Sequence, residues 1–143
     1  MNSVIAVAVA GGLVVLIVVM IVVHKRVPRK PKQRYFVAQW LELQAYCKNK
    51  ATWPQAIIAA DNLLDKALKR RRFGGRSMGE RLVSAQRSLT QNDMTWFAHN
   101  LRKKITSNPE LKLRETDVKQ ALIGFRQALR DIGALPDEQG KEP

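Results

Sequence analysis

The sequence predicts an all-α protein: an N-terminal transmembrane helix followed by a small cytoplasmic bundle of four to five helices. Three observations support this prediction. Residues 4–23 form a continuous apolar run without a charged or strongly polar side chain. After this run, apolar residues recur at helical spacing and no alternating strand pattern is present. Gly, Pro and capping residues separate the helical stretches at short intervals, which is typical of a compact bundle.

Length and composition exclude several classes of protein. The chain has 143 residues, of which 25 are Lys or Arg and 12 are Asp or Glu, for a formal net charge of +13. That length suits one modest domain. A single cysteine, Cys47, excludes an intramolecular disulfide, and no C-x-x-C, H-E-x-x-H or Cys/His cluster offers a zinc site. We therefore expect no metal and no cofactor.

The apolar run at 4–23 is long enough to cross a membrane once. As a helix rising about 1.5 Å per residue, it is roughly 30 Å long, the thickness of the hydrocarbon core. Too few residues precede the run for the basic segment that begins a cleaved signal peptide, so we expect an uncleaved anchor in the plasma membrane. Small residues four positions apart offer a face on which two copies of the span would pack. They are Ala6 with Ala10, and Ala8 with Gly12.

Residues 24–34 are predicted to be a basic juxtamembrane linker. Pro28 and Pro31 would interrupt a helix leaving the membrane. No basic residue precedes the span, so the positive-inside rule places the N-terminus outside and the bundle in the cytoplasm. General attraction to an anionic leaflet is favoured over recognition of one particular lipid. The predicted lipid contacts are Lys25, Arg26, Arg29, Lys30, Lys32 and Arg34.

The bundle is predicted to occupy residues 35–135, and its first two helices follow from periodicity and capping. A helix over 33–48 has one apolar face. The residues on that face are Phe36, Trp40, Leu43 and Cys47. The second helix begins at Thr52, which forms an S/T-x-x-Q capping box with Gln55 and has proline in its first turn. A basic run and the turn 73–75 end it.

Ser77 and Glu80 form a second capping box, which opens a short helix over 78–88. The inward positions of this helix are predicted to be Leu82, Val83 and Ala85. Residues 75–79 also match G-x-S-x-G, the pattern of a nucleophile elbow, but that elbow requires a strand before the serine. We therefore interpret Ser77 as a helix cap and assign no catalytic residue.

The last two helices are predicted from a third capping pattern and from a proline break. Thr90 opens a helix that runs to about residue 106, and Pro109 follows it. The final helix, 115–132, stops at Gly133. Residues 136–143 are polar and are predicted to be a disordered tail.

The bundle is basic in its own right, because residues 35–135 carry 18 basic and 9 acidic side chains. Such a surface attracts nucleic acid, anionic lipid or an acidic protein. Successive helical residues turn about 100° apart, so the four bases of 69–72 do not share one face, and a helix that reads a nucleic-acid groove is not indicated. Solvation is favoured over phosphate or headgroup contact. The anion-binding candidates are Lys66, Lys69, Arg70, Arg71, Arg72 and Arg76.

Asp61 falls on the apolar stripe of the second bundle helix, where an unpaired carboxylate would be costly to bury. The fourth bundle helix offers His99 and Arg102, which are three residues apart and therefore on one side of that helix. We predict a buried polar cluster of Asp61 with His99 or Arg102. A structural role is favoured over a catalytic acid, because buried ion pairs are usually architectural.

The segment 96–107 resembles the Arg-x(4–6)-His region of HEPN domains, which often reads W-x-A-H-x-x-R-N-x-I-A-H. The matching residues are Trp96, Ala98, His99, Arg102 and Ile105. Residues 59–65 and 79–82 extend the likeness to bacterial proteins that pair such a domain with one membrane span. The resemblance implies a helical fold and, in active members, metal-independent RNA cleavage by Arg and His.

Where that pattern has Asn and His, this chain has Lys103 and then Thr106, Ser107 and Asn108. None of these side chains serves as a general base near neutral pH as imidazole does. The expected function is therefore a noncatalytic interaction module held at the membrane. The alternatives are a membrane-tethered RNA-binding protein or RNase, and a structural subunit of a membrane complex. The expected partners are the bilayer and a cytoplasmic or membrane protein, with nucleic acid and self-association through the span as alternatives.

Overall fold

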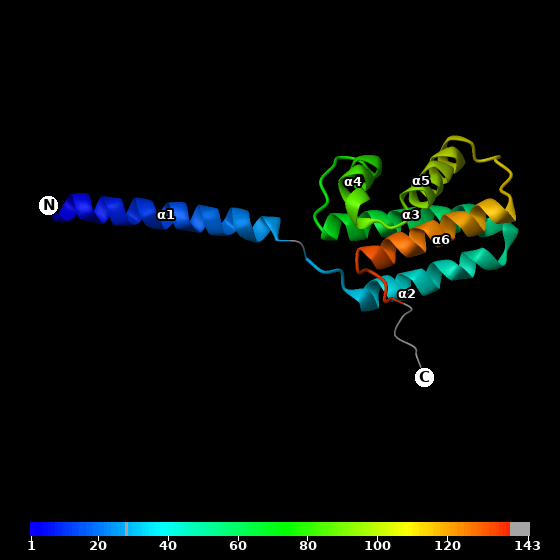
Figure 1. Cartoon of the computed structure of the whole chain (residues 1–143), viewed down its shortest axis with the longest axis horizontal. Coiled ribbons are helices and arrows are strands. Elements are labelled where there is room, and N and C mark those ends of the chain that lie inside the picture. The colour runs from blue at the N-terminus through cyan, green and yellow to red at the C-terminus, as the bar shows by residue number, and fades with distance from the viewer. Residues whose placement is uncertain (28, 138–143) are drawn as a thin grey trace.

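The structure is a computed structural model that describes residues 1–27 and 29–137, apart from the side chains of Asn2, Ala6 and Arg26. Within these ranges every regular element is a helix, as predicted. The α-helices are α1 (Asn2–Arg26), α2 (Gln33–Gln44), α3 (Trp53–Arg70), α4 (Met78–Ala85), α5 (Asn92–Ser107) and α6 (Glu115–Asp131), and three 3-10 turns are η1 (Ala45–Lys48), η2 (Lys50–Thr52) and η3 (Gln86–Ser88). Helix α1 extends from one end of a bundle formed by the others (Figure 1).

Helix α1 is long and apolar enough to cross a membrane by length and composition, over Ser3–Lys25. None of the most apolar stretch of this helix is buried against the rest of the chain. The helix continues to Arg26, three residues beyond the predicted end of the span, because no helix breaker occurs before Pro28. The connection to α2 is therefore shorter than the predicted linker 24–34. The predicted break at Pro28 and residues 138–143 of the predicted tail lie outside the described residues.

Helix α3 is the centre of the bundle and packs against α2, α4, α5 and α6. Small and large apolar residues alternate along its buried side, so neighbouring helices approach closely. The buried apolar residues of α3 are Ala56, Ile57, Ala60, Leu63, Leu64, Ala67 and Leu68. Helices α5 and α6 pack against each other, and Phe125 of α6 is fully buried in the core of the bundle. This arrangement brings one side of α3 against α5, where the polar cluster was predicted.

Two of the three predicted capping boxes are absent. The hydroxyl of Thr52 donates to the carbonyl oxygens of Tyr46 and Asn49 and does not cap α3, and the first predicted helix gives way at residue 45 to the turns η1 and η2. Thr90 binds the carboxylate of Asp131 on α6, so α5 begins at Asn92 without a side-chain cap. The Thr52 hydroxyl thus bonds to the preceding turns and the Thr90 hydroxyl to a distant helix, and neither caps the helix that the local pattern predicted.

The capping box at Ser77 is present in part. The hydroxyl of Ser77 accepts from the backbone N–H of Glu80, while the Glu80 carboxylate accepts from the N–H of Arg76 instead of that of Ser77. Val83 was predicted to face inward, but its side chain is 55% exposed. Helix α4 is only eight residues long and packs mainly on α3, so its neighbours Leu82 and Ala85 fill the contact.

Candidate functional site

The carboxylate of Asp61 lies inside the bundle, on the side of α3 that faces α5. Asp61 is 2% exposed and His99 is 6% exposed. Oδ1 of Asp61 lies 2.8 Å from Nδ1 of His99. Because a carboxylate oxygen only accepts, Nδ1 carries the hydrogen of this bond and Nε2 is the second ring nitrogen.

Arg102 completes the cluster from the same helix as His99. Its Nε lies 3.5 Å from Oδ2 of Asp61, a distance that makes an ion pair and not a well-formed hydrogen bond. The Arg102 side chain is 32% exposed, so the guanidinium reaches the surface while its Nε is buried. The structure therefore brings Asp61, His99 and Arg102 together, with both carboxylate oxygens facing a positive or polar group.

Helix α4 and Trp96 close the cluster on the side of Nε2. The Trp96 ring meets the His99 ring edge to face, with centroids 6.0 Å apart. A Cβ built at Gly79 of α4 would lie 3.9 Å from Nε2 of His99 and 3.8 Å from the Trp96 ring. The imidazole is therefore held by a carboxylate at one nitrogen and covered near the other by the backbone of α4. Sequence reasoning did not place Gly79 in this site.

A second ion pair, which sequence reasoning missed, lies one helical turn further along α3. Nε of Arg81 donates to Oδ1 of Asp65 at 2.6 Å, and Nη1 of Arg81 donates to the carbonyl oxygen of Gly75 at 2.7 Å. Lys69 contacts the other oxygen of Asp65 at 2.7 Å. The buried Arg81 thus fixes α4 and the preceding loop to α3. The four-residue spacing of Asp61 and Asp65 was the available sequence signal, since it places both carboxylates on one side of α3.

The Asp65 carboxyl is perturbed by these contacts. Burial alone would raise its pKa, but the hydrogen bonds and charges of Arg81 and Lys69 outweigh that effect. The pKa of Asp65 therefore lies below its ordinary value. The contact connects α4 to α3, because Arg81 of α4 donates to Asp65 of α3.

The side chains at the positions where HEPN domains carry histidine form hydrogen bonds with nearby backbone groups. The hydroxyl of Thr106 donates to the carbonyl oxygen of Arg102, and that of Ser107 donates to the carbonyl oxygen of Lys103. Oδ1 of Asn108 accepts from the backbone N–H of Glu110. These side chains bond to nearby backbone at the end of α5, so they do not join His99 and Arg102 in a common site.

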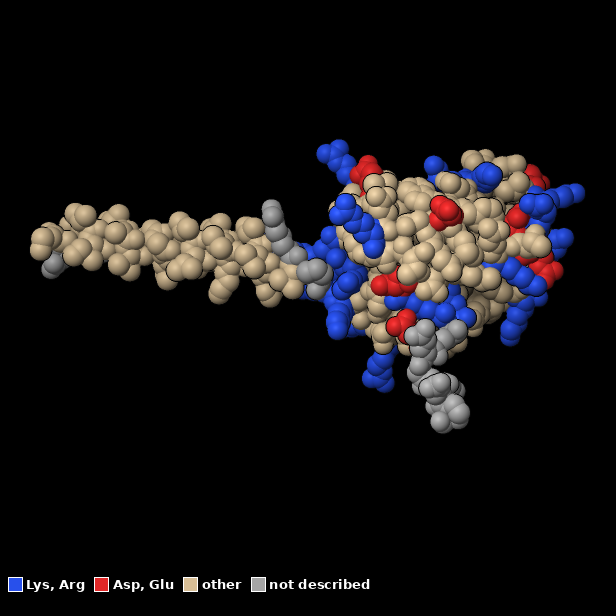
Figure 2. Space-filling model, in the orientation of Figure 1, with Lys and Arg blue, Asp and Glu red and all other residues tan. Residues whose placement is uncertain are grey.

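The predicted anion-binding residues separate into groups with different surroundings. Lys69 is paired with Asp65, and Arg71 is half-buried. Arg72 adopts φ 61° in the turn that ends α3, and Arg76 is exposed. Lys66 and Arg70 line an open cavity with residues of α2. Figure 2 shows Lys and Arg side chains gathered at the end of the bundle next to α1.

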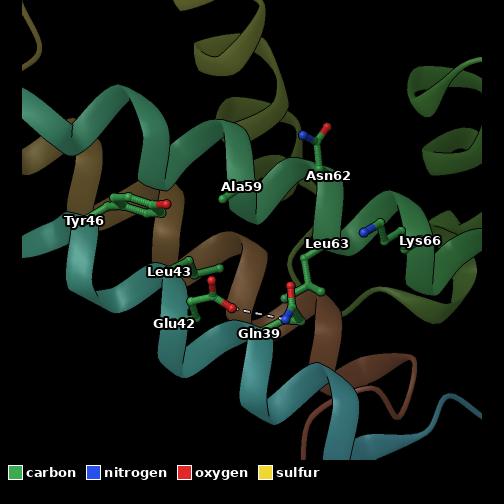
Figure 3. A pocket seen from close by; sticks show the side chains of 8 residues that line it. All are labelled: Gln39, Glu42, Leu43, Tyr46, Ala59, Asn62, Leu63 and Lys66. Carbon is green, nitrogen blue, oxygen red and sulfur yellow. Dashed lines mark hydrogen bonds between the residues drawn. The ribbon is translucent and has the colours of Figure 1, made fainter.

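A further cavity of about 250 Å³ lies between α2 and α3. Its walls are Gln39, Glu42, Leu43 and Tyr46 of α2, and Ala59, Asn62, Leu63 and Lys66 of α3. Figure 3 shows these side chains on the two neighbouring helices, and Nε2 of Gln39 donates to Glu42 at 3.2 Å. The carboxamides and the Glu42 carboxylate make this cavity polar, and one cation, Lys66, stands at one end.

Within the described ranges, no group of three His, Cys, Asp or Glu side chains converges in a way that could hold a metal ion. Cys47 is half-buried, and burial raises the pKa of its thiol, so the thiolate is disfavoured at neutral pH.

Comparisons with protein-family models, with curated proteins and with solved structures gave no match. The resemblance to HEPN domains therefore rests on the motif residues alone.

Proposed function

We propose that this protein is a single-pass membrane protein whose basic helical bundle is a noncatalytic binding module at the cytoplasmic face of the plasma membrane. The observation that carries the proposal is helix α1. Its large apolar side chains are exposed all along the helix, although such a surface is unfavourable in water. A bilayer supplies the apolar surroundings that the bundle does not.

The charge at the junction supports the proposed orientation. Basic residues are concentrated directly after α1, in the connection to α2, where the positive-inside rule places the cytoplasmic side. The bundle then presents further Lys and Arg side chains at the same end (Figure 2). An anionic cytoplasmic leaflet would attract this end and hold the bundle close to the surface.

The noncatalytic role is supported by the buried cluster. Asp61 uses both carboxylate oxygens on His99 and Arg102, and α4 covers the far side of the imidazole. A general base needs a nitrogen or oxygen within reach of a substrate proton. In this arrangement the cluster joins α3 to α5. The proposal therefore assigns binding, and not catalysis, to the surface of the bundle.

Membrane insertion and topology are tested together by cysteine labelling. Cys47 is the single cysteine of the chain, so Cys47→Ser provides a cysteine-free background. In that background, a membrane-impermeant maleimide should label Ser3→Cys on intact cells, and Arg87→Cys only after permeabilisation. Extraction of the chain by alkaline carbonate, without detergent, would contradict the anchor. Labelling of Arg87→Cys on intact cells would contradict the orientation.

The class of partner is tested by crosslinking in native membranes, followed by identification of bound protein and RNA. A protein partner supports the proposal. Recovery of RNA whose binding weakens steeply with added salt would instead support the RNA-binding alternative. Cleavage of that RNA, abolished by Arg102→Ala, would establish an RNase and overturn the noncatalytic role.

A further inference from the structure

A cavity at the end of the bundle next to α1 combines residues that the sequence placed in two separate groups. Its volume is about 340 Å³, and its lining residues are Lys32, Tyr35, Phe36, Lys66 and Arg70. Lys32 precedes α2, whereas Lys66 and Arg70 belong to the last two turns of α3. The antiparallel packing of α2 and α3 brings these cations together (Figure 1).

The polar groups of this cavity are arranged to receive an anion. Nζ of Lys66 donates to the hydroxyl oxygen of Tyr35 at 3.4 Å, which leaves the phenolic hydrogen available to an acceptor. The Tyr35 side chain is 44% exposed, and its ring meets the buried Phe36 edge to face at 5.2 Å. Within the described residues, Lys32, Lys66 and Arg70 form no ion pair with a carboxylate, in contrast to Lys69 on the same helix. Three positive charges and one hydroxyl therefore face one cavity.

The cavity also lies close to the proposed membrane surface. Four residues lie between Val27, just after α1, and Lys32. A fully extended chain spans at most about 3.6 Å per step, so the tether is shorter than about 18 Å. The headgroup layer adds several ångströms to each face of the hydrocarbon core. Lipid headgroups are therefore the anions presented to this cavity at the highest local concentration.

We infer that Lys32, Tyr35, Lys66 and Arg70 form a binding site for the phosphate of an anionic phospholipid headgroup. The inference rests on the proposed membrane anchor and names one ligand of the bundle. Arg70 supplies a planar guanidinium that pairs with two phosphate oxygens, the two lysines supply point charges, and Tyr35 donates a hydrogen bond. Phe36 forms the apolar floor of the site.

The test uses the full chain in nanodiscs of phosphatidylcholine, with or without 30% phosphatidylglycerol. Acetylation of individual lysines is followed by mass spectrometry. We expect phosphatidylglycerol to slow acetylation of Lys32 and Lys66 at least fivefold and to leave that of Lys103 on α5 nearly unchanged. Equal slowing at Lys103 would overturn the site in favour of general attraction to the surface. Equal slowing in phosphatidylcholine discs with 10 mM inorganic phosphate would overturn the lipid as the source of the phosphate.

A second measurement compares two charge-matched triple variants. Lys32→Gln, Lys66→Gln and Arg70→Gln should reduce the phosphatidylglycerol that remains with the detergent-extracted chain at least threefold relative to the original protein. Arg87→Gln, Lys103→Gln and Lys104→Gln remove the same charge from exposed positions outside the cavity. Equal loss in both variants would overturn the site. Failure of the chain to enter the discs would overturn the proposed anchor as well, whereas entry without protection would overturn the site alone.

Discussion

Asp61 shows how a single buried charge constrains its neighbours. Its carboxylate lies in the core of the bundle, and its two oxygens face His99 and Arg102. Burial of an ionised carboxylate is strongly unfavourable unless partners replace its water. The same requirement explains Asp65, whose partners are Arg81 and Lys69. Two acids on α3 thus connect it to α5 and α4.

Replacement of Asp61 by Asn should destabilise the bundle by about 3 kcal/mol, because His99 and Arg102 then lack a negative partner. The measurement is urea unfolding of the full chain in mild detergent, followed by tryptophan fluorescence. Asp93→Asn is the matched control, since Asp93 is exposed and should change stability by less than about 0.5 kcal/mol. Equal stability of the two variants would contradict a structural role for the cluster.

The lowered pKa of Asp65 makes the stability of the folded chain depend on pH in the acid range. Its pKa is lower in the folded chain than in the unfolded chain, where the ordinary value is about 3.9. Its contribution is therefore fully present above about pH 4 to 5 and is lost as the pH falls through the folded pKa. Asp65→Asn should be less stable than the original chain at pH 6, and the difference in Tm should narrow toward pH 3. Parallel Tm curves would exclude the Asp65 contacts as a source of the acid sensitivity.

At the scale of elements, the close approach of neighbouring backbone segments determines where glycine is required. Gly124 of α6 lies against α5, where a Cβ would be 2.6 Å from the carbonyl oxygen of Met94. Gly75 adopts φ 144° in the loop before α4, where a Cβ would lie 2.7 Å from the backbone nitrogen of Arg81. Backbone atoms do not move aside as the end of a flexible side chain does. Glycine is therefore needed at both positions.

We expect Gly124→Ala to separate α5 from α6 and to destabilise the bundle by about 2 kcal/mol, as overpacking of a close contact does. Gln120→Ala, on an exposed position of the same helix, controls for the introduction of an alanine where no other helix packs. Thermal unfolding by circular dichroism measures both variants. A Gly124→Ala variant as stable as the original chain would show that α5 and α6 are not in close contact at Met94.

At the scale of the whole molecule, α1 and the bundle are structurally separate. The apolar side chains of α1 are exposed, and the core of the bundle consists of residues from Phe36 onward. A chain that begins at Arg29 should consequently fold without α1 and keep its Tm within a few degrees of that of the full protein. Differential scanning fluorimetry of the two chains tests this. Loss of the cooperative transition in the shorter chain would show that α1 contributes to the core.

The helical content of the chain and the positions of most helices could be predicted from local patterns. Apolar periodicity located α5 and α6 closely, because both helices bury one continuous face. The caps of α3 and α5 and the exposure of Val83 could not be predicted in this way. Each of these depends on which neighbour competes for a hydroxyl or covers a face.

For the candidate site, Asp61 stood out because a charged residue interrupted an apolar stripe. His99 and Arg102 followed as partners on a facing helix. Arg81 and Gly79 gave no comparable signal, since an arginine or a glycine in a short helix fits an exposed position equally well. Their roles come from the position of α4 on α3.

The sequence by itself determined the apolar helix, the helical class and the excess of positive charge, since these depend on composition and on periodicity along one segment. Only the tertiary structure decided that Lys32, Lys66 and Arg70 share a cavity, and that Asp61 and Asp65 have different partners. Contacts between residues distant in sequence depend on the packing of whole helices. The packing depends on how all buried faces fit together at once.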